Sequence, residues 1–426
     1  MTRLLYALLL IGVSSLASAD ASIAVTLDED LETVTVTVNN PGAALQGFGK
    51  SVWRNIVTVE NGNVRGRKLI RQNPELPIAY KANLDYASRE FRFRRWRGQL
   101  RLTDWTSWLL LPEDWRMSRP VTITITVPDQ GAAVLPFELK SHEPGRSVYH
   151  AYPILPAHGG FSGFGDITIH PVNLGDMTVN TAIVGGNALD YASWTRIVTG
   201  AAGATHRALP GDNALIALVP TPMRKGTVPW AHVKRGGGSH VIAYVNDAAS
   251  LQELLDDWTL FHEVSHLYHP YLRGSDRWVS EGFASYFQNV YRARVEVVTP
   301  EFALGRLQAG IERGRKENPK RGHVPVTKGG GMRTYWTAAA MALNADYIIR
   351  QRSEGKKTLA SVMGEFATAN LPTEKTWRAA QYLAALDQIL GFELLLPMYR
   401  KTVQDRYLPE LLMDEKAAIS MLADKS

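Results

Sequence analysis

The sequence has 426 residues and no cysteine. Without a thiol there is no disulfide bond, no thiolate ligand for a metal ion and no lipid attached to an N-terminal cysteine. Any metal site must therefore use other side chains, such as histidine and carboxylate. An exported chain without cysteine is compatible with a bacterial periplasm or with secretion.

Long apolar runs are scarce, and the one that stands out is N-terminal. Arg3 precedes an apolar stretch from Leu4 to Val13, and Ala17, Ser18 and Ala19 follow it. This order is typical of a secretory signal peptide cleaved after Ala19, and the run is short for a membrane-spanning helix. The sequence predicts a signal peptide at 1–19 and a periplasmic or secreted chain without stable membrane insertion. An uncleaved membrane anchor is the alternative.

A strong excess of one charge sign is also missing. Removing Arg3 leaves 46 basic and 41 acidic residues, a net charge of +5. This mild excess is compatible with weak contact with an anionic envelope surface. Residues 89–101 interleave arginine with aromatic residues, which fits a nucleic-acid strand, an envelope polyanion site or a solvated basic face. For an exported chain we expect no nucleic-acid partner.

The order of patterns along the chain predicts an α+β fold, and no internal repeat or long low-complexity linker interrupts it. Residues 20–150 alternate at period two, as in 33–38 and 120–129, and predict a β-sandwich-like N-terminal domain. Residues 151–295 mix short strands with glycine and proline and then turn helical. Residues 296–426 predict a helical C-terminal region. The helical patterns cover about 281–293, 302–315, 335–352, 375–391 and the C-terminal tail.

Histidine is scarce, with 11 in the chain, yet three fall between Phe261 and Pro270. His262, Glu263 and His266 form an H-E-x-x-H pattern. Four residues of helix turn by about 400°, so both imidazoles project from one face and can reach one zinc ion. Glu263 is placed to take a proton from a zinc-bound water.

The surroundings of the pattern argue against two histidines on a solvated helix face. Ser250 and Glu253 form a capping box at the start of a helical pattern. Apolar residues follow at helical spacing as far as Trp258, and His262 and His266 continue that stripe. We therefore expect one capped helix whose histidines face the protein body.

A catalytic zinc site needs a third protein ligand. His269 is near in sequence, but a straight helix rises about 10.5 Å from His262 to His269. Pro270 also biases His269 away from helical conformation. Glu281 opens the next helical pattern, and two antiparallel helices would bring it over the histidines. The alternative for Glu281 is an ordinary helix-start glutamate favoured by the helix dipole.

These motifs together resemble the gluzincin metallopeptidases, in which H-E-x-x-H is followed by W-x-x-E-G-F-x-x-Y. The second motif matches at Trp278, Glu281, Gly282, Phe283 and Tyr286. The chain is most similar to the glycyl aminopeptidase family, without room for its C-terminal PDZ domain. The resemblance implies a thermolysin-like catalytic domain at 151–295, completed by 296–426. It implies one zinc ion on His262, His266 and Glu281, with Glu263 as general base.

The resemblance also implies two further parts of the site. Tyr335 matches the tyrosine that stabilises the tetrahedral oxyanion. Gly236, Gly237, Gly238, Ser239 and His240 match the edge strand that holds an extended substrate. Ser239 stands where aminopeptidases carry a glutamate for the free amine of the substrate. The prediction is therefore a zinc metallopeptidase acting on peptides or proteins, either aminopeptidase-like or an endopeptidase. The alternative is a catalytically weak or inactive zinc-containing envelope protein that binds peptides or polyanions.

Overall fold

The computed structural model describes most of the chain, with gaps along it and at both ends. The described residues are 20–84, 100–115, 120–152, 159–174, 177–185, 188–208, 214–222, 225–235, 239–317, 325–328, 331–373 and 375–424. The predicted signal peptide lies outside them.

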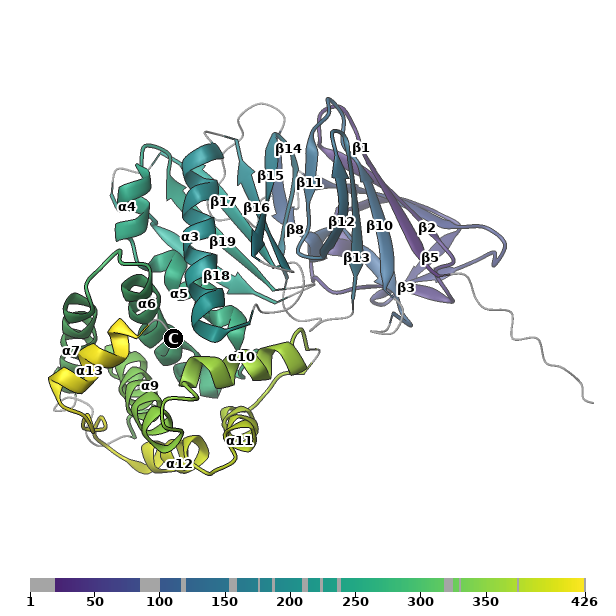
Figure 1. Ribbon diagram of the computed structural model, residues 1–426. Helices are drawn as coiled ribbons and strands as arrows, with labels where there is room; N and C mark the ends of the chain where they lie inside the picture. The colour runs from purple at the N-terminus through teal and green to yellow at the C-terminus, as the bar shows by residue number, and fades with distance from the viewer. Residues whose placement is uncertain are drawn as a thin grey trace, which may run out of the picture.

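The N-terminal unit consists of β-sheets (Figure 1). The largest has the strand order β12 (Glu138–Glu143), β13 (Arg146–Ala151), β10 (Val121–Thr126), β1 (Ser22–Leu27), β2 (Thr33–Asn39), β7 (Ile78–Asn83) and β4 (Ile56–Glu60). A second has the order β5 (Gly62–Arg65), β6 (Lys68–Arg71), β3 (Ala44–Gly47) and β9 (Leu110–Pro112). Burial alternates along β1 and β2, because successive side chains of a strand point to opposite faces. This alternation is the pattern that predicted strands here.

A third sheet of the N-terminal unit has the order β11 (Ala132–Val134), β14 (Phe161–Gly165) and β8 (Leu100–Asp104). Two short helices, α1 (Val52–Asn55) and η1 (Trp105–Ser107), lie among these strands. β14 comes after residue 150, where the sequence pattern predicted the end of this domain. Its pairing with β8 and β11 places it with the N-terminal strands.

The central sheet has the order β15 (Ile167–Leu174), β16 (Met177–Val184), β17 (Leu215–Thr221), β19 (His240–Asn246) and β18 (Trp230–Lys234). Its two faces belong to two different cores. Ile216 and Val241 face the core shared with the helices, whereas Leu215 and Ile242 face β8, β11 and β14. The central sheet is therefore covered on both faces.

Helices cover one face of the central sheet and make up the rest of the chain (Figure 1). They are α3 (Ala188–His206), α4 (Leu251–Asp256), α5 (Thr259–Ser265), η2 (His266–Tyr268), η3 (Gly274–Asp276), α6 (Arg277–Arg294), α7 (Pro300–Lys316), α9 (Met332–Arg352), α10 (Leu359–Asn370), α11 (Ala379–Leu390), α12 (Leu395–Gln404) and α13 (Glu415–Ala423). The α+β fold class is confirmed. Across the described residues, none of these helices combines the length and the apolarity that a membrane span requires.

Two long helices were absent from the sequence prediction, α3 and α10, as was the single turn α1. α3 packs against α4, α5, α6, α10 and the central sheet, so several of its faces are buried. A helix that is buried on several sides carries no single apolar stripe, and its 3.6-residue period is hidden. Residues 188–206 therefore looked like part of an irregular segment.

Candidate metal centre and its cleft

The two histidines of the H-E-x-x-H pattern lie on consecutive turns of α5 and η2. Both side chains are buried, with 6% of each residue exposed. The capping box of Ser250 and Glu253 is present, but it caps α4, which ends at Asp256. The prediction of one continuous helix is therefore wrong. Trp258 separates the two helices and is 42% exposed, so it does not belong to a buried stripe.

Glu281 is brought to the histidines by α6, which packs against both α5 and α9. Other residues of its motif pack α6 against α9 and α12. A Cβ atom on Gly282 would come within 2.2 Å of the Ala338 Cβ atom, so α6 and α9 lie unusually close. Trp278 stacks on Tyr399 with 5.7 Å between ring centroids. The Tyr286 hydroxyl donates a hydrogen bond to Asp346 Oδ2 at 2.8 Å. The backbone position of Glu281 is thus fixed by its neighbours.

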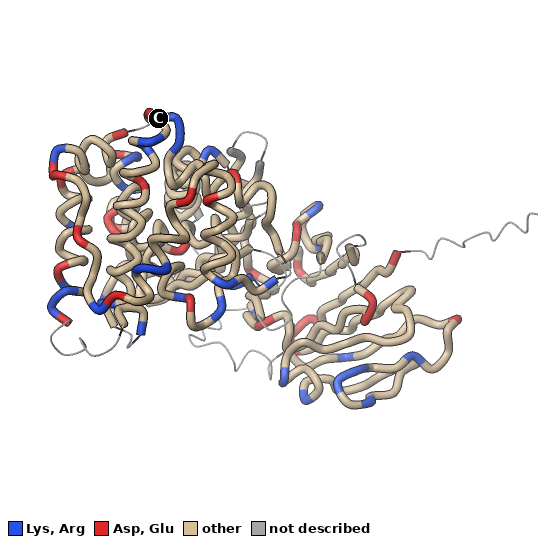
Figure 2. The backbone as a smooth tube through the Cα atoms, turned by 90° about the horizontal axis from the view of Figure 1, so that it is seen from below, with Lys and Arg blue, Asp and Glu red and all other residues tan. Residues whose placement is uncertain are grey.

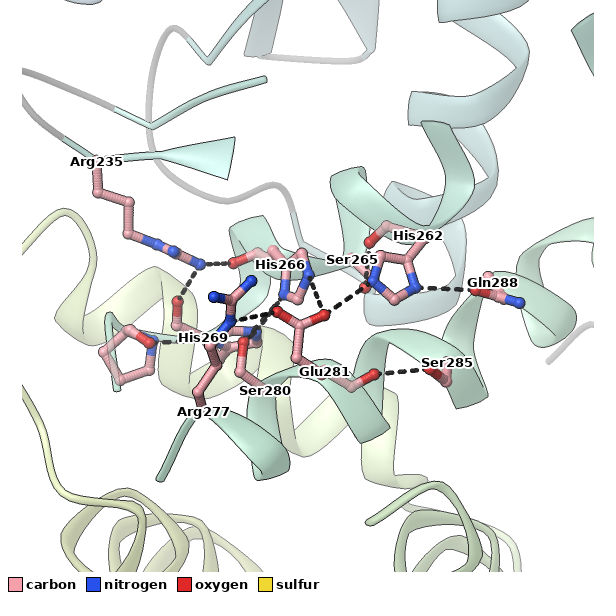
Figure 3. Close-up of polar contacts among 11 residues, drawn as sticks. Arg235, His262, Ser265, His266, His269, Arg277, Ser280, Glu281, Ser285 and Gln288 are labelled. Carbon is pink, nitrogen blue, oxygen red and sulfur yellow. Dashed lines mark hydrogen bonds and ion pairs between the residues drawn. The ribbon is translucent and has the colours of Figure 1, made fainter. Parts of the chain in front are cut away.

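His262, His266 and Glu281 form one group of potential metal ligands (Figure 3). Glu281 Oε2 lies 3.4 Å from His262 Nε2 and 3.9 Å from His266 Nε2. One ligand atom from each residue lies within 4.8 Å of the other two. Two imidazole nitrogens and one carboxylate oxygen are the donor set of a catalytic zinc site with an open fourth position. The residues present fit that metal.

Hydrogen bonds set the orientation and tautomer of both imidazoles. His262 Nδ1 donates to Gln288 Oε1 at 2.9 Å, which leaves Nε2 as the lone-pair nitrogen. His269 Nδ1 donates to the Pro270 carbonyl at 2.9 Å, so in neutral His269 the Nε2 atom is an acceptor. It lies 3.1 Å from His266 Nδ1. Ser280 Oγ also lies 3.1 Å from His266 Nδ1 and 3.1 Å from His269 Nε2. With these two acceptors beside it, His266 Nδ1 carries the proton, and His266 Nε2 also keeps its lone pair toward Glu281.

His269 lies beside the group and takes no part in it. Its backbone is extended, with φ −138° and ψ 155°, which fits the predicted influence of Pro270. Burial, with the charge of Arg235 added to it, lowers the pKa of His269 to about 3. A neutral His269 is the form that can accept the hydrogen bond from His266.

Charged neighbours flank the group on two sides. Arg277 Nε donates to Glu281 Oε1 at 2.9 Å, which leaves Oε2 toward the histidines. Arg235 donates to the carbonyl oxygens of His266 and His269. Arg235 directly follows β18, so these hydrogen bonds connect the end of that strand to the backbone around η2.

The protonation tendencies follow from burial and from these charges. Burial raises the pKa of Glu263 to about 7, and the nearby Glu281 carboxylate adds to the effect. Burial alone would raise the pKa of Glu281, but without a metal ion a protonated His262 donates from Nε2 to this carboxylate. That hydrogen bond, with the charges of His262 and Arg277, holds the pKa of Glu281 below its usual value. In neutral His262, the form that binds a metal, Nε2 carries the lone pair. Burial and the neighbouring His262 hold the pKa of His266 well below its usual value.

The group opens into a cleft of 990 Å³. β18, α5, α6 and the first turn of α9 line the cleft, and Asp104 and Phe161 reach it from the N-terminal unit. Tyr335 lines it from α9. Burial raises the pKa of the Tyr335 phenol, and the charges of Glu281 and Glu263 add to the effect. Tyr335 thus lies in the field of the same carboxylates, as a residue near the reacting centre would.

The edge strand beside the cleft is β18, which pairs only with β19 among the described strands. The sequence placed this edge at 236–240, several residues too late. His240 belongs to β19, has a strand on either side and is fully buried. Its Nε2 atom accepts a hydrogen bond from Phe161 N at 3.1 Å. Ser239 lies directly before β19, and Gly236, Gly237 and Gly238 lie outside the described residues.

Several residues of the site were missed by the sequence prediction, and some left a signal. Arg277 and Gln288 lie four residues before and seven residues after Glu281, on one face of α6. That spacing could have found them once Glu281 was taken as a ligand. Arg235 carries no such signal, because it follows a strand that is distant in sequence. Of the basic segment 89–101, only Leu100 and Arg101 are described, at the start of β8.

The sequence and the fold were compared with those of known proteins. No protein-family model matches the sequence, and a search of curated proteins returns no relative. Solved structures do match. The match to an aminopeptidase N family protein from Idiomarina loihiensis covers 92% of this chain and 76% of that protein's chain, at 14% identity and TM-score 0.64. The match to the M1 zinc metallopeptidase from Deinococcus radiodurans covers 92% of this chain and 95% of that enzyme's chain, at 14% identity and TM-score 0.52. The match to a mutant of that enzyme, bound to a Tyr-Ser-Ala substrate, covers 92% of this chain and 94% of the mutant's chain, at 15% identity and TM-score 0.53. The chain therefore has the fold of these zinc metallopeptidases.

Proposed function

We propose that this protein is a zinc-dependent metallopeptidase of the gluzincin type, aminopeptidase-like or an endopeptidase. The observation that carries the proposal is the group of His262, His266 and Glu281, with Glu263 beside it in a large cleft. The fold of the M1 zinc metallopeptidases supports it, and so does the peptide bound to the Deinococcus radiodurans mutant.

In this proposal His262, His266 and Glu281 hold one zinc ion, which supplies Lewis acidity and lowers the pKa of water toward neutrality. Glu263 accepts a proton from the attacking water and later donates it to the leaving amine. The Tyr335 hydroxyl donates to the negative charge that develops on the carbonyl oxygen. The extended peptide lies along the β18 edge by strand addition.

The test combines metal removal with one conservative substitution. Purified protein is incubated with a peptide library, with and without a chelator, and the products are identified by mass spectrometry. We expect hydrolysis that the chelator abolishes and zinc restores. Glu263→Gln should retain zinc by elemental analysis and lose hydrolysis. Full hydrolysis by Glu263→Gln would reject the mechanism.

The same experiment distinguishes the proposed peptidase from the alternative function. A zinc-containing envelope protein that only binds peptides or polyanions would hold the metal and cleave nothing. The positions of the cleaved bonds also separate an aminopeptidase from an endopeptidase. We further propose export with removal of residues 1–19, which the mass of the mature protein tests.

A further inference from the structure

The charges that line the cleft are unbalanced. Figure 2 shows basic and acidic residues interspersed through the molecule, but the cleft differs. Among the described residues, its charged lining consists of Lys234, Arg235, Arg277, Arg306, Arg313, Asp104, Glu263 and Glu281. Basic side chains thus outnumber acidic ones, five to three. The excess points to a negatively charged ligand.

Most of these charges already have partners. Lys234 Nζ lies 3.3 Å from Asp104 Oδ2. Arg277 is bound to Glu281, and Arg235 is bound to backbone carbonyls. A substrate ammonium group therefore meets no spare carboxylate in the described lining except Glu263, the proposed base. An aminopeptidase that holds a free amine needs such a carboxylate.

Arg306 and Arg313 remain, and they share one wall of the cleft. They are seven residues apart, on the same face of α7. Both are exposed, and neither has an acidic partner among the described residues. The Arg313 guanidinium carbon lies 5.4 Å from the centroid of the Trp336 ring. This wall lies beside Tyr335, because α7 packs along α9.

Resting on the proposed function, we propose that the cleft selects peptides that present a carboxylate to Arg306 and Arg313. The carboxylate comes from an acidic side chain or from a free C-terminus. A planar guanidinium binds a carboxylate through two parallel hydrogen bonds, a geometry that a lysine cannot offer. Stacking on Trp336 keeps the Arg313 guanidinium in place and reduces the entropy lost on binding.

The test uses four fluorogenic peptides of one length. They carry either Glu or Gln at one position, and each has a free or an amidated C-terminus. We expect kcat/KM to be about tenfold higher for a peptide with the recognised carboxylate, which corresponds to one charge-assisted contact. The peptide pair that shows the preference identifies its source, side chain or C-terminus.

Variants then locate the preference. Arg306→Gln combined with Arg313→Gln should bring the ratio of kcat/KM values between carboxylate and amide peptides close to one. Arg315→Gln is the matched control, since Arg315 lies on the same helix but pairs with Glu410 at 2.8 Å, outside the cleft. It should leave the ratio unchanged. Thermal melting of each variant verifies folding.

The outcomes distinguish this inference from the proposed function. If the protein cleaves carboxylate and amide peptides equally well, the inference is wrong and the peptidase stands. If it cleaves no peptide, fluorescence anisotropy with the same four peptides measures binding instead. A preference in binding that the double variant removes supports the inference without hydrolysis. Equal binding of all four peptides overturns it.

Discussion

At the scale of single residues, the metal group depends on hydrogen bonds made on the far side of each imidazole. Gln288 fixes His262, and His269, itself fixed by the Pro270 carbonyl, fixes His266. Such partners of metal-binding histidines determine which nitrogen carries the lone pair. His269 therefore matters for the site although it lies outside the group of potential ligands.

We predict that His269→Ala lowers the zinc affinity about 10-fold, because His266 then keeps only the Ser280 hydroxyl, 3.1 Å away, as an acceptor for its Nδ1 proton. His269→Gln should recover part of the affinity, since an amide oxygen can accept that proton. Competition with a zinc-binding dye measures both constants. His150→Ala, in the N-terminal sheet, is the control. Equal zinc affinity in His269→Ala and the wild type would contradict the role.

At the scale of elements, the position of Glu281 depends on how closely α6 approaches α9. Gly282 makes the approach possible, because the space for its Cβ atom is filled by Ala338. The glycine next to the glutamate in the motif thus has a structural reason. The sequence placed the two helices correctly but gave no information about the distance between them.

We predict that Gly282→Ala destabilises the fold by about 1–3 kcal/mol and lowers zinc content, because α6 must move away from α9. Gly305→Ala is the matched control. Gly305 is also helical, but a Cβ atom there meets nothing within 4 Å. It should stabilise α7 by up to about 1 kcal/mol. Urea unfolding measures the free energy of unfolding of both variants. An unchanged free energy of unfolding in Gly282→Ala would refute the packing argument.

A second contact between elements makes stability depend on pH. His206, at the end of α3, donates from Nδ1 to the Ala360 carbonyl at 2.8 Å and accepts from the Tyr291 hydroxyl at 2.6 Å. It also stacks on Tyr268 at 3.7 Å between ring centroids. Burial lowers the pKa of His206 from 6.5 to about 3. Neutral His206 therefore ties α3 to α6 and α10.

Below pH 6.5 the unfolded chain binds a proton at His206 and the folded chain does not, so stability falls as the pH falls toward 3. Each pH unit costs about 1.4 kcal/mol for this group. We predict that His206→Gln loses about 2 kcal/mol less than the wild type between pH 7 and pH 5. Urea unfolding at both values measures this, with His150→Gln as control. Identical losses in the two proteins would contradict it.

At the scale of the whole molecule, the N-terminal unit and the central sheet share one core. Leu102 and Phe161 from β8 and β14 pack in the same cluster as Ala217 and Ile242 from β17 and β19. The β domain is therefore the second layer of the sheet that supports the site. It also contributes Asp104 to the cleft, paired with Lys234.

We predict that the chain unfolds in a single calorimetric transition, because neither unit can separate without exposing this shared core. Leu102→Ala should lower the stability of the whole chain by about 2–5 kcal/mol, including the helices. Helical circular dichroism and tryptophan fluorescence should report the same midpoint. Val64→Ala, at an exposed position of β5, is the control. Two separated transitions would contradict the shared core.

The sequence by itself determined many of the elements and predicted the residues of the candidate site. Alternation predicted β2 and β10, helical spacing predicted α6, α7 and α9, and two motifs predicted His262, His266 and Glu281, because local periodicity and residue type are written along the chain. Tertiary structure decided what depends on distance across the fold. It separated α4 from α5, made β18 the edge strand, placed β14 beside β8, and aligned Arg306 with Arg313 along the cleft. These features arise from contacts between segments far apart in sequence, which no local pattern records.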